Sequence, residues 1–184
     1  MASELGVQTI QHTNGTDALT IASNGTLTSS VPVGFKVTQR ATSSNPSVLP
    51  HDVYTRIVTM DTTNGFDTHG GWSNSTDCYT VPTGCAGYWF VKGQVELEIQ
   101  SGLNYIVIGK VTGSLNNGSN WWVKSGHLGQ SNSLTNNILQ TSTVLYLNEG
   151  DIITLGAYHD YGVDRDYLGT EDYDRTFLLG WRMF

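Results

Sequence analysis

The chain has 184 residues, enough for one domain with a substantial core and a short appendage but too few for two ordinary domains. Charged residues make up only 14%, so Thr, Ser, Asn and Gly must wet most of the surface, a composition that suits a large assembly better than a free cytosolic enzyme. The net charge of −7, without a cluster of Lys and Arg, argues against a phosphate backbone as a ligand, and we expect no nucleic acid partner.

The beginning of the sequence carries no sign of export. Residues 1–6 lack a basic region followed by an apolar run, and no segment approaches the ~18 consecutive apolar residues that span a bilayer. We therefore expect synthesis in the cytoplasm and no membrane insertion.

Two Asn-Gly-Thr triplets, at 14–16 and 24–26, flank the alternating run from Ala18 to Ala22. This pattern predicts short strands joined by tight turns. Strands with so few large apolar side chains are marginal alone, so this segment must pack against copies of itself or against a host structure.

A joint follows this segment, because Pro32 and Gly34 interrupt strand pairing and small polar residues precede them. We expect a β-rich amino-terminal stub at 1–34, serving attachment or trimerisation, and a knob domain at 35–184.

The sequence of the knob domain predicts an all-β fold, because nearly every gap between apolar runs carries Gly, Pro or Asn and no stretch has convincing helical periodicity. A sandwich or a barrel of about ten strands would satisfy this pattern. The expected strands are 35–42, 54–61, 78–81, 88–99, 103–112, 121–124, 138–147, 151–159 and 176–184.

The strongest local signal lies between Leu145 and Leu155. Leu145 and Leu147 alternate with other residues before a turn at Gly150, and Ile153 and Leu155 alternate after it. A period of two on both sides of a turn indicates two half-buried antiparallel strands.

Cys78 and Cys85 are separated by six residues that include Pro82 and Gly84. The spacing would allow a small loop disulfide, but closing so short a loop would add little stability. The pair also lacks the further His or Cys residues of a zinc site. Reduced thiols are the expected state.

Three segments follow one another in a characteristic order. The first runs from Tyr79-Thr80-Val81-Pro82 to Gly87-Tyr88-Trp89-Phe90-Val91, the second is the strand pair around Gly150, and the third is Leu178-Leu179-Gly180-Trp181-Arg182-Met183. Together they resemble the trimeric jelly roll of the complement first component q globular head, which shares its architecture with the tumour necrosis factor ligands. The resemblance covers roughly the last three quarters of the chain.

The sequence departs from the family pattern in three places. Two residues are inserted within 83–86, Trp89 and Val91 stand where the family usually has Tyr and Phe, and Leu179 replaces a small residue.

The resemblance implies an antiparallel jelly-roll β-sandwich whose chains associate as three around an axis. We expect the following residues in the core of the fold or of the trimer: Tyr79, Pro82, Gly87, Trp89, Leu145, Leu147, Gly150, Asp151, Ile153, Leu155, Gly180, Trp181 and Phe184.

The segment 1–34, punctuated by its Asn-Gly turns, also resembles the stubs that precede such knobs in structural proteins of tailed bacteriophages. This resemblance implies a non-enzymatic virion protein, a homotrimer fixed to other virion proteins by its stub, that decorates the capsid or ends a tail fibre. Particle stabilisation or adhesion to a host-surface glycan or protein is the expected role.

The densest acidic cluster lies between residues 160 and 174. Its carboxylates could surround a calcium ion, and the interleaved tyrosines could contact a receptor. The spacing lacks the glycine and the alternation of an EF-hand loop, which favours a solvated loop with local ion pairs and no cofactor. The cluster comprises Asp160, Asp164, Asp166, Glu171, Asp172 and Asp174, with Tyr161, Tyr167 and Tyr173.

Trp121 and Trp122 follow a polar turn and could stack on sugar rings. Alternation along a strand sends only one of two adjacent side chains outward, so one of them is expected in the core.

An enzyme is the alternative interpretation. A glycan hydrolase or a glycan-binding tail protein could use the acidic and aromatic segment 160–174, given two carboxyl groups about 5 to 9.5 Å apart, one of them in an apolar setting. The five histidines are scattered singly, and the sequence has neither a zinc motif nor a nucleophile elbow. We therefore expect no enzymatic activity.

Overall fold

The chain divides into two compact units, Met1–Pro32 and Val33–Phe184. Within the described part no helix is long and apolar enough to cross a membrane. The computed structural model describes residues 9–11, 17–21, 23–25, 27–29, 32–40, 47–97, 104–111, 125–129, 137–168 and 175–183.

The first unit is a small antiparallel sheet in the order β1-β2-β3. Its strands are β1 (Thr9–Gln11), β2 (Asp17–Ile21) and β3 (Leu27–Ser29). The tight turn expected between the second and third strands lies at 23–25, where Gly25 has a φ of 80°, a conformation that glycine adopts without steric cost.

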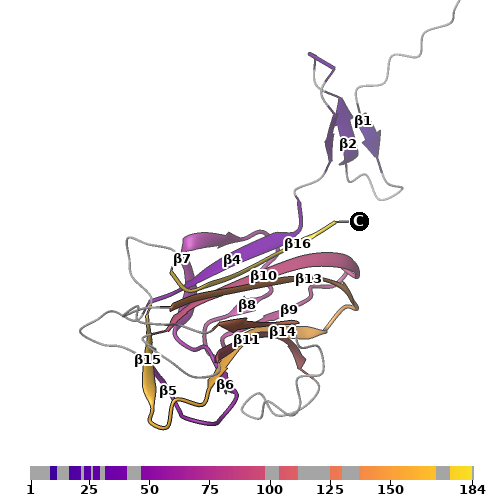
Figure 1. Cartoon of the computed structure of the whole chain (residues 1–184). Helices are drawn as coiled ribbons and strands as arrows, with labels where there is room; N and C mark the ends of the chain where they lie inside the picture. Colours follow the sequence, from indigo (N-terminus) through magenta and orange to yellow (C-terminus); the bar gives the residue numbers. More distant parts are fainter. Residues whose placement is uncertain are drawn as a thin grey trace, which may run out of the picture. The chain divides into compact units, whose positions relative to one another are not determined.

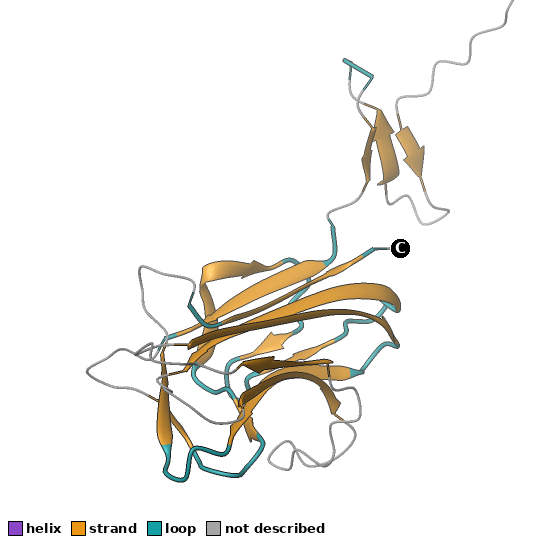
Figure 2. Ribbon diagram, viewed as in Figure 1, coloured by secondary structure: helices purple, strands orange, loops and turns teal. Residues whose placement is uncertain are grey.

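The second unit is a sandwich of two antiparallel sheets (Figures 1 and 2). One sheet contains β4 (Gly34–Gln39), β5 (Ser47–Leu49), β7 (Met60–Asp67), β10 (Gly87–Leu97), β13 (Asn137–Leu147), β15 (Arg165–Leu168) and β16 (Phe177–Arg182). The other contains β6 (Thr55–Arg56), β8 (Trp72–Ser73), β9 (Cys78–Thr80), β11 (Asn104–Val111), β12 (Ser125–Gly129) and β14 (Ile152–His159). The expected all-β class and antiparallel sandwich are confirmed.

Strand β10 is central to the first sheet. It pairs along its whole length with β13 on one side, and on the other side with β16 and then with β15. The sheet continues from β16 through β4 to β7, so the first and last strands of the second unit are neighbours (Figure 1).

The core lies between the two sheets and is rich in aromatic rings. Phe35 stacks on Tyr79 with ring centroids 3.9 Å apart, and both side chains are fully buried. Trp89 is also fully buried, and its indole N–H donates to the carbonyl of Cys85 at 3.2 Å. A buried indole therefore keeps a hydrogen-bond partner, as a stable core requires.

The turn around Gly150 connects the two sheets. Strand β13 belongs to the first sheet and β14 to the second, so the two strands joined by this turn do not pair with each other. Gly150 has a φ of 78°, and its N–H donates to the carbonyl of Val81 at 2.9 Å. The turn thereby carries the chain across the edge of the sandwich.

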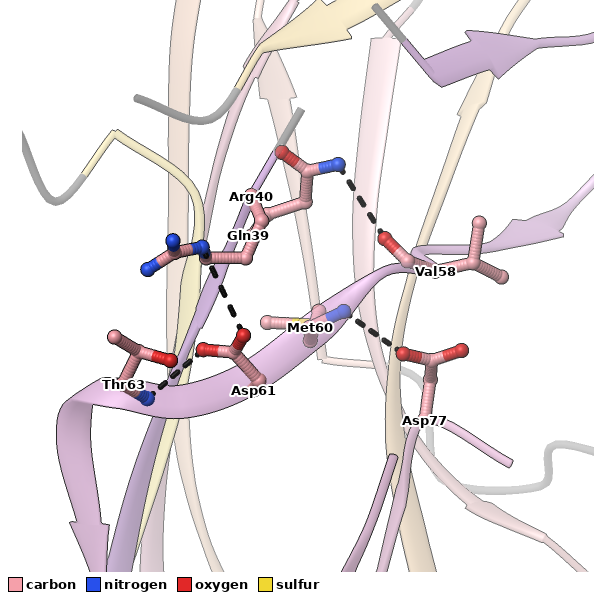
Figure 3. A network of polar contacts seen from close by, with 7 residues as sticks. All are labelled: Gln39, Arg40, Val58, Met60, Asp61, Thr63 and Asp77. Carbon is pink, nitrogen blue, oxygen red and sulfur yellow. Dashed lines mark hydrogen bonds and ion pairs between the residues drawn. The ribbon is translucent and has the colours of Figure 1, made fainter. Parts of the chain in front are cut away.

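The strand expected at 54–61 is divided between the sheets. Residues 55–56 form β6 beside β14, whereas β7 begins at Met60 beside β4. Thr59 has a φ of 61° at the change of sheet, and the N–H of Met60 donates to the buried carboxylate of Asp77 at 2.8 Å (Figure 3). An unfavourable backbone conformation at Thr59 is thus held by a buried hydrogen bond on the next residue.

Candidate subunit interface

The first sheet is apolar on both sides along the first half of β10. Trp89 and Val91 are fully buried against the second sheet. Because successive side chains of a strand point to opposite faces, Tyr88 and Phe90 project away from the core. The second face therefore exposes aromatic rings where a solvated sheet would carry polar side chains.

The neighbouring strands place further apolar side chains beside these rings. Tyr88 is opposite Tyr146 of β13, and Phe90 is opposite both Val144 of β13 and Trp181 of β16. The rings of Tyr88 and Tyr146 meet edge to face with centroids 5.2 Å apart, whereas those of Phe90 and Trp181 stack at 4.5 Å. Directly opposed residues share one face of a sheet, so these side chains form a continuous surface.

This surface continues across β16 and β4 to β7. Leu179 is opposite Lys36, and Lys36 is opposite Phe66. We call the outward surface made by these side chains the apolar face; it comprises Phe66, Tyr88, Phe90, Val144, Tyr146, Leu179 and Trp181.

The large side chains of the apolar face are widely open to solvent in the isolated chain. Tyr146 is 55% exposed, Val144 51%, Phe66 49%, and Tyr88 and Trp181 45% each. Soluble monomers rarely expose contiguous apolar patches larger than a few hundred Å². Apolar surface of this kind is typical of a site that contacts another molecule.

Two lysines lie within the same surface. The Nζ atoms of Lys36 and Lys92 are each 5.8 Å from the ring centroid of Phe177, and both residues are opposite Leu179. Their aliphatic stems can cover apolar surface while the charged ends stay near water or a ring face.

The face becomes polar toward the other end of β10. Gln140 donates to the side-chain carbonyl of Gln94 at 2.6 Å, and Gln94 donates to the backbone carbonyl of Arg175 at 2.9 Å. Arg175 also forms a 2.8 Å ion pair with Glu96, which is only 3% exposed. Hydrogen-bonded polar groups at one end and bare aromatic rings at the other would fix how a partner docks.

The sandwich has the fold of known jelly-roll proteins, and the resemblance drawn from three sequence segments is confirmed at the level of the fold. The globular domain of zebrafish complement 1qA protein matches with 14% identity and a TM-score of 0.56, over 83% of this chain and 98% of that chain. Murine APRIL at pH 5.0 matches with 14% identity and a TM-score of 0.56, over 82% and 98%. The PRD1 vertex protein P5 matches with 12% identity and a TM-score of 0.58, over 84% and 100%. Neither a family model nor a curated protein sequence matches the chain.

The residues expected in the fold or trimer core occupy three different places. Most lie between the sheets, where Tyr79, Trp89, Leu147, Ile153 and Leu155 are fully buried. Gly87 and Gly180 are also buried, Leu145 packs against the core and Pro82 is half-buried. Trp181 instead belongs to the apolar face, Gly150 and Asp151 lie in the turn between the sheets, and Phe184 is outside the described residues.

The predicted role of Tyr167 as a receptor contact is wrong. Residues 165–168 form strand β15 rather than a loop, and Tyr167 is fully buried. Its hydroxyl accepts a 3.0 Å hydrogen bond from the N–H of Val58, and burial raises the pKa of the phenol. The ring is part of the core because β15 pairs with both β5 and β10.

The rest of the acidic segment is only partly described. Tyr161 is half-buried beneath the guanidinium of Arg165, which lies 3.9 Å from its ring centroid, and Asp164 accepts the N–H of His51 at 3.0 Å. Asp160 and Asp166 are half-buried at the two ends of this region. Among the described residues no group of three or more His, Cys, Asp or Glu side chains is arranged to hold a metal ion. Trp121, Trp122, Glu171, Asp172, Tyr173 and Asp174 are outside the described residues.

Both cysteines are buried free thiols. Burial raises the pKa of Cys78 and of Cys85, so each thiol holds its proton more tightly than in water. Neither has the lowered pKa of a reactive cysteine.

Sequence reasoning missed most of the apolar face. It included Trp181 but not Phe66, Tyr88, Phe90, Val144 or Tyr146. The signal was present, because Tyr88-Trp89-Phe90-Val91 and Val144-Leu145-Tyr146-Leu147 are unbroken apolar runs. A continuous apolar run predicts a strand that is covered on both faces, and among the described residues only one face of these strands is buried.

Proposed function

We propose that the chain is a non-enzymatic structural protein of a bacteriophage particle and that three copies associate through the apolar face. The observation that carries the proposal is this surface of exposed Tyr146, Val144 and Trp181 on a jelly-roll sheet. Burying such side chains against identical neighbours removes them from water at a gain of about 25 cal/mol per Å² of apolar area.

A closed assembly of identical chains suits this surface. The rings lie on adjacent strands near the sheet centre, while hydrogen-bonded polar groups occupy one end. The resemblance to the complement and tumour necrosis factor jelly rolls supports three as the number of copies. A cyclic trimer uses the same surfaces on every copy and leaves none of them open.

The virion assignment rests on two supports. The PRD1 vertex protein P5, from a phage, shares the jelly-roll fold at a TM-score of 0.58. The first unit, Met1–Pro32, contains a three-stranded sheet of its own and could attach the chain to other virion proteins. Capsid decoration and the tip of a tail fibre are both compatible with this arrangement, with particle stabilisation or host adhesion as the role.

The trimer is tested by substitutions on the apolar face. Val144→Glu and Tyr146→Glu place charges at half-exposed positions, so the single chain should still fold while the assembly dissociates. Val53→Glu is the matched control, because Val53 is 49% exposed in the turn before β6, a strand of the other sheet. Dissociation of the first two variants but not of the control supports the proposal. Unchanged mass of all three would contradict it.

The virion location is tested by labelling. Antibodies raised against the chain should bind intact particles of the phage that encodes it, and deletion of residues 1–32 should prevent incorporation without preventing trimer formation. Particles that lack the chain would contradict the assignment.

The non-enzymatic character and the absence of a cofactor are tested separately. Incubation with host polysaccharide should release no reducing ends, and a chelator or added calcium should leave the melting temperature unchanged. Release of sugar, or a calcium-dependent melting temperature, would favour the alternative interpretations of segment 160–174.

A further inference from the structure

Two histidines hold the turn between β14 and β15. The Nδ1 atom of His51 accepts the N–H of Gly162 at 3.0 Å, and the Nδ1 atom of His159 accepts the N–H of Tyr161 at 3.4 Å. The two rings lie with centroids 6.1 Å apart. The successive backbone N–H groups of Tyr161 and Gly162 therefore each donate a hydrogen bond to an imidazole.

The hydrogen bonds define the protonation of both rings. The Nε2 atom of His159 lies 2.9 Å from the carbonyl oxygen of Leu49. A carbonyl oxygen can only accept a hydrogen bond, so Nε2 of His159 carries the proton. Its Nδ1 then has a lone pair, which accepts the hydrogen bond from the N–H of Tyr161. Nδ1 of His51 must likewise be unprotonated to accept from Gly162. Both side chains are neutral in this arrangement.

A proton on either Nδ1 would replace an acceptor with a donor that points at an N–H. The hydrogen bond would then be lost and two donors would face each other. His159 has no exposed surface, so its protonation would also leave a charge inside the sandwich. Histidine is the side chain that ordinarily changes charge between pH 5 and 8.

The other titratable and charged groups around the two rings come from the same loops. Asp164 accepts the backbone N–H of His51, Asp160 adjoins His159, and Arg165 lies over Tyr161. Asp52 accepts the hydroxyl of Tyr158 at 2.6 Å; this hydrogen bond, the largest cause, raises the pKa of Tyr158 to about 12. From β5 the contact is the backbone of Leu49, and from β11 the residue opposite His159 is the neutral Asn104.

We propose that His51 and His159 form an acid-sensitive latch, which holds residues 160–163 while both imidazoles are neutral and releases them when the imidazoles take up protons. Gly162, with a φ of 95°, and the 55% exposed Val163 lie in the released turn. The backbone N–H of His51 donates to the carboxylate of Asp164. This hydrogen bond does not involve the imidazole, so the end of the turn at Asp164 stays attached. The latch is independent of the trimer, because it uses none of the residues of the apolar face.

Amide hydrogen exchange of the full chain, followed by NMR at pH 7.5 and pH 5 and corrected for intrinsic exchange, tests the latch. The protection of Gly162 and Tyr161 should fall at least about tenfold at the lower pH, while the N–H of Ile57, bonded to Leu155, keeps its protection. Full protection of Gly162 at both pH values would overturn the proposal, and so would an unprotected Gly162 at pH 7.5.

Substitutions separate the imidazole from the fold. His51→Asn places a carboxamide oxygen near the position of Nδ1 and cannot titrate, so Gly162 should stay protected at pH 5. His51→Ala should leave Gly162 unprotected at both pH values. His69→Asn is the control, because His69 contacts Thr68 at 2.8 Å in the turn before β8 and should behave as the native chain does. A pH response in His51→Asn equal to that of the native chain would overturn the latch.

Discussion

The rings of Phe90 and Trp181 stack with centroids 4.5 Å apart across β10 and β16, on the side of the sheet that faces away from the core. Trp181 is 45% exposed in the isolated chain. Soluble monomers rarely expose contiguous apolar surface of this kind. The exposure of this aromatic pair is explained if another chain covers it.

Trp181→Ala should weaken association more than folding. Truncating a central interface tryptophan typically costs about 2 kcal/mol or more of binding free energy, which is roughly a thirtyfold change in the dissociation constant. Sedimentation velocity over a range of concentrations measures this. A variant that associates as tightly as the native chain would remove Trp181 from the interface.

Gly180→Ala should destabilise the fold itself. A Cβ at this position would lie 2.8 Å from Cε1 of Phe35, whose ring is stacked on Tyr79 and has little room to move. Overpacking of this kind costs about 1 to 3 kcal/mol. Urea unfolding at fixed chain concentration gives the value.

A double-mutant cycle provides the control for this clash. Phe35→Leu removes the ring, so adding Gly180→Ala to it should cost less than Gly180→Ala in the native chain. Equal costs in both backgrounds would show that the ring is not the obstacle.

Asp151 should stabilise the turn between the sheets in a pH-dependent way. Its carboxylate accepts Lys110 Nζ at 2.5 Å and the N–H of Asn148 at 2.7 Å. Burial, the largest influence, raises the pKa of Asp151, but the hydrogen bonds and the charge of Lys110 outweigh it, and the net shift is downward. The stability is therefore complete above the unfolded pKa and is lost as the pH falls through the folded one.

Asp151→Asn should lower the free energy of unfolding by about 1 to 3 kcal/mol at pH 7. The difference from the native chain should shrink as the pH falls through the lowered pKa of Asp151, because the native carboxyl then also gains a proton. A difference that is the same above and below that pKa would contradict the lowered pKa.

Asp77 should have the opposite dependence. Burial raises its pKa above the ordinary 3.8, although the N–H of Met60 and the charge of Arg56 act in the other direction. A raised carboxyl pKa contributes stability that is complete below the unfolded pKa and is lost as the pH rises through the folded one. Ionised Asp77 therefore costs stability at neutral pH.

Asp77→Asn should keep the hydrogen bond from Met60 through its side-chain oxygen and should gain stability, relative to the native chain, between pH 3.5 and pH 7. Urea unfolding at both pH values measures this. Asp61→Asn is the control, because Asp61 pairs with Arg40 near the surface at 3.7 Å and such pairs contribute about 1 kcal/mol or less (Figure 3). If the free energy of unfolding of Asp77→Asn instead fell relative to that of the native chain as the pH rises, the raised pKa would be contradicted.

Much of the fold follows from the alternation of the sequence. Leu145 to Leu155 indicates two strands and a turn because side chains of period two and a glycine are local features. The pairing of these strands is not local: β13 pairs with β10 and β14 with β11, and alternation alone does not distinguish this from a hairpin.

The acidic segment shows where local patterns fail. Tyr167 and its neighbours read as a polar loop, but pairing with β5 and β10 places this tyrosine in the core. Tertiary pairing overrides the propensity of a short polar segment. The roles of His51 and His159 were likewise hidden, because the two residues are 108 positions apart in sequence.

The mass of the full chain in solution tests the central claim most directly. Light scattering coupled to size-exclusion chromatography should give three times the chain mass of 20.1 kDa, unchanged on dilution to low micromolar concentration. A species of one chain mass at every concentration would contradict the account, because the apolar face would then have no second copy to cover it.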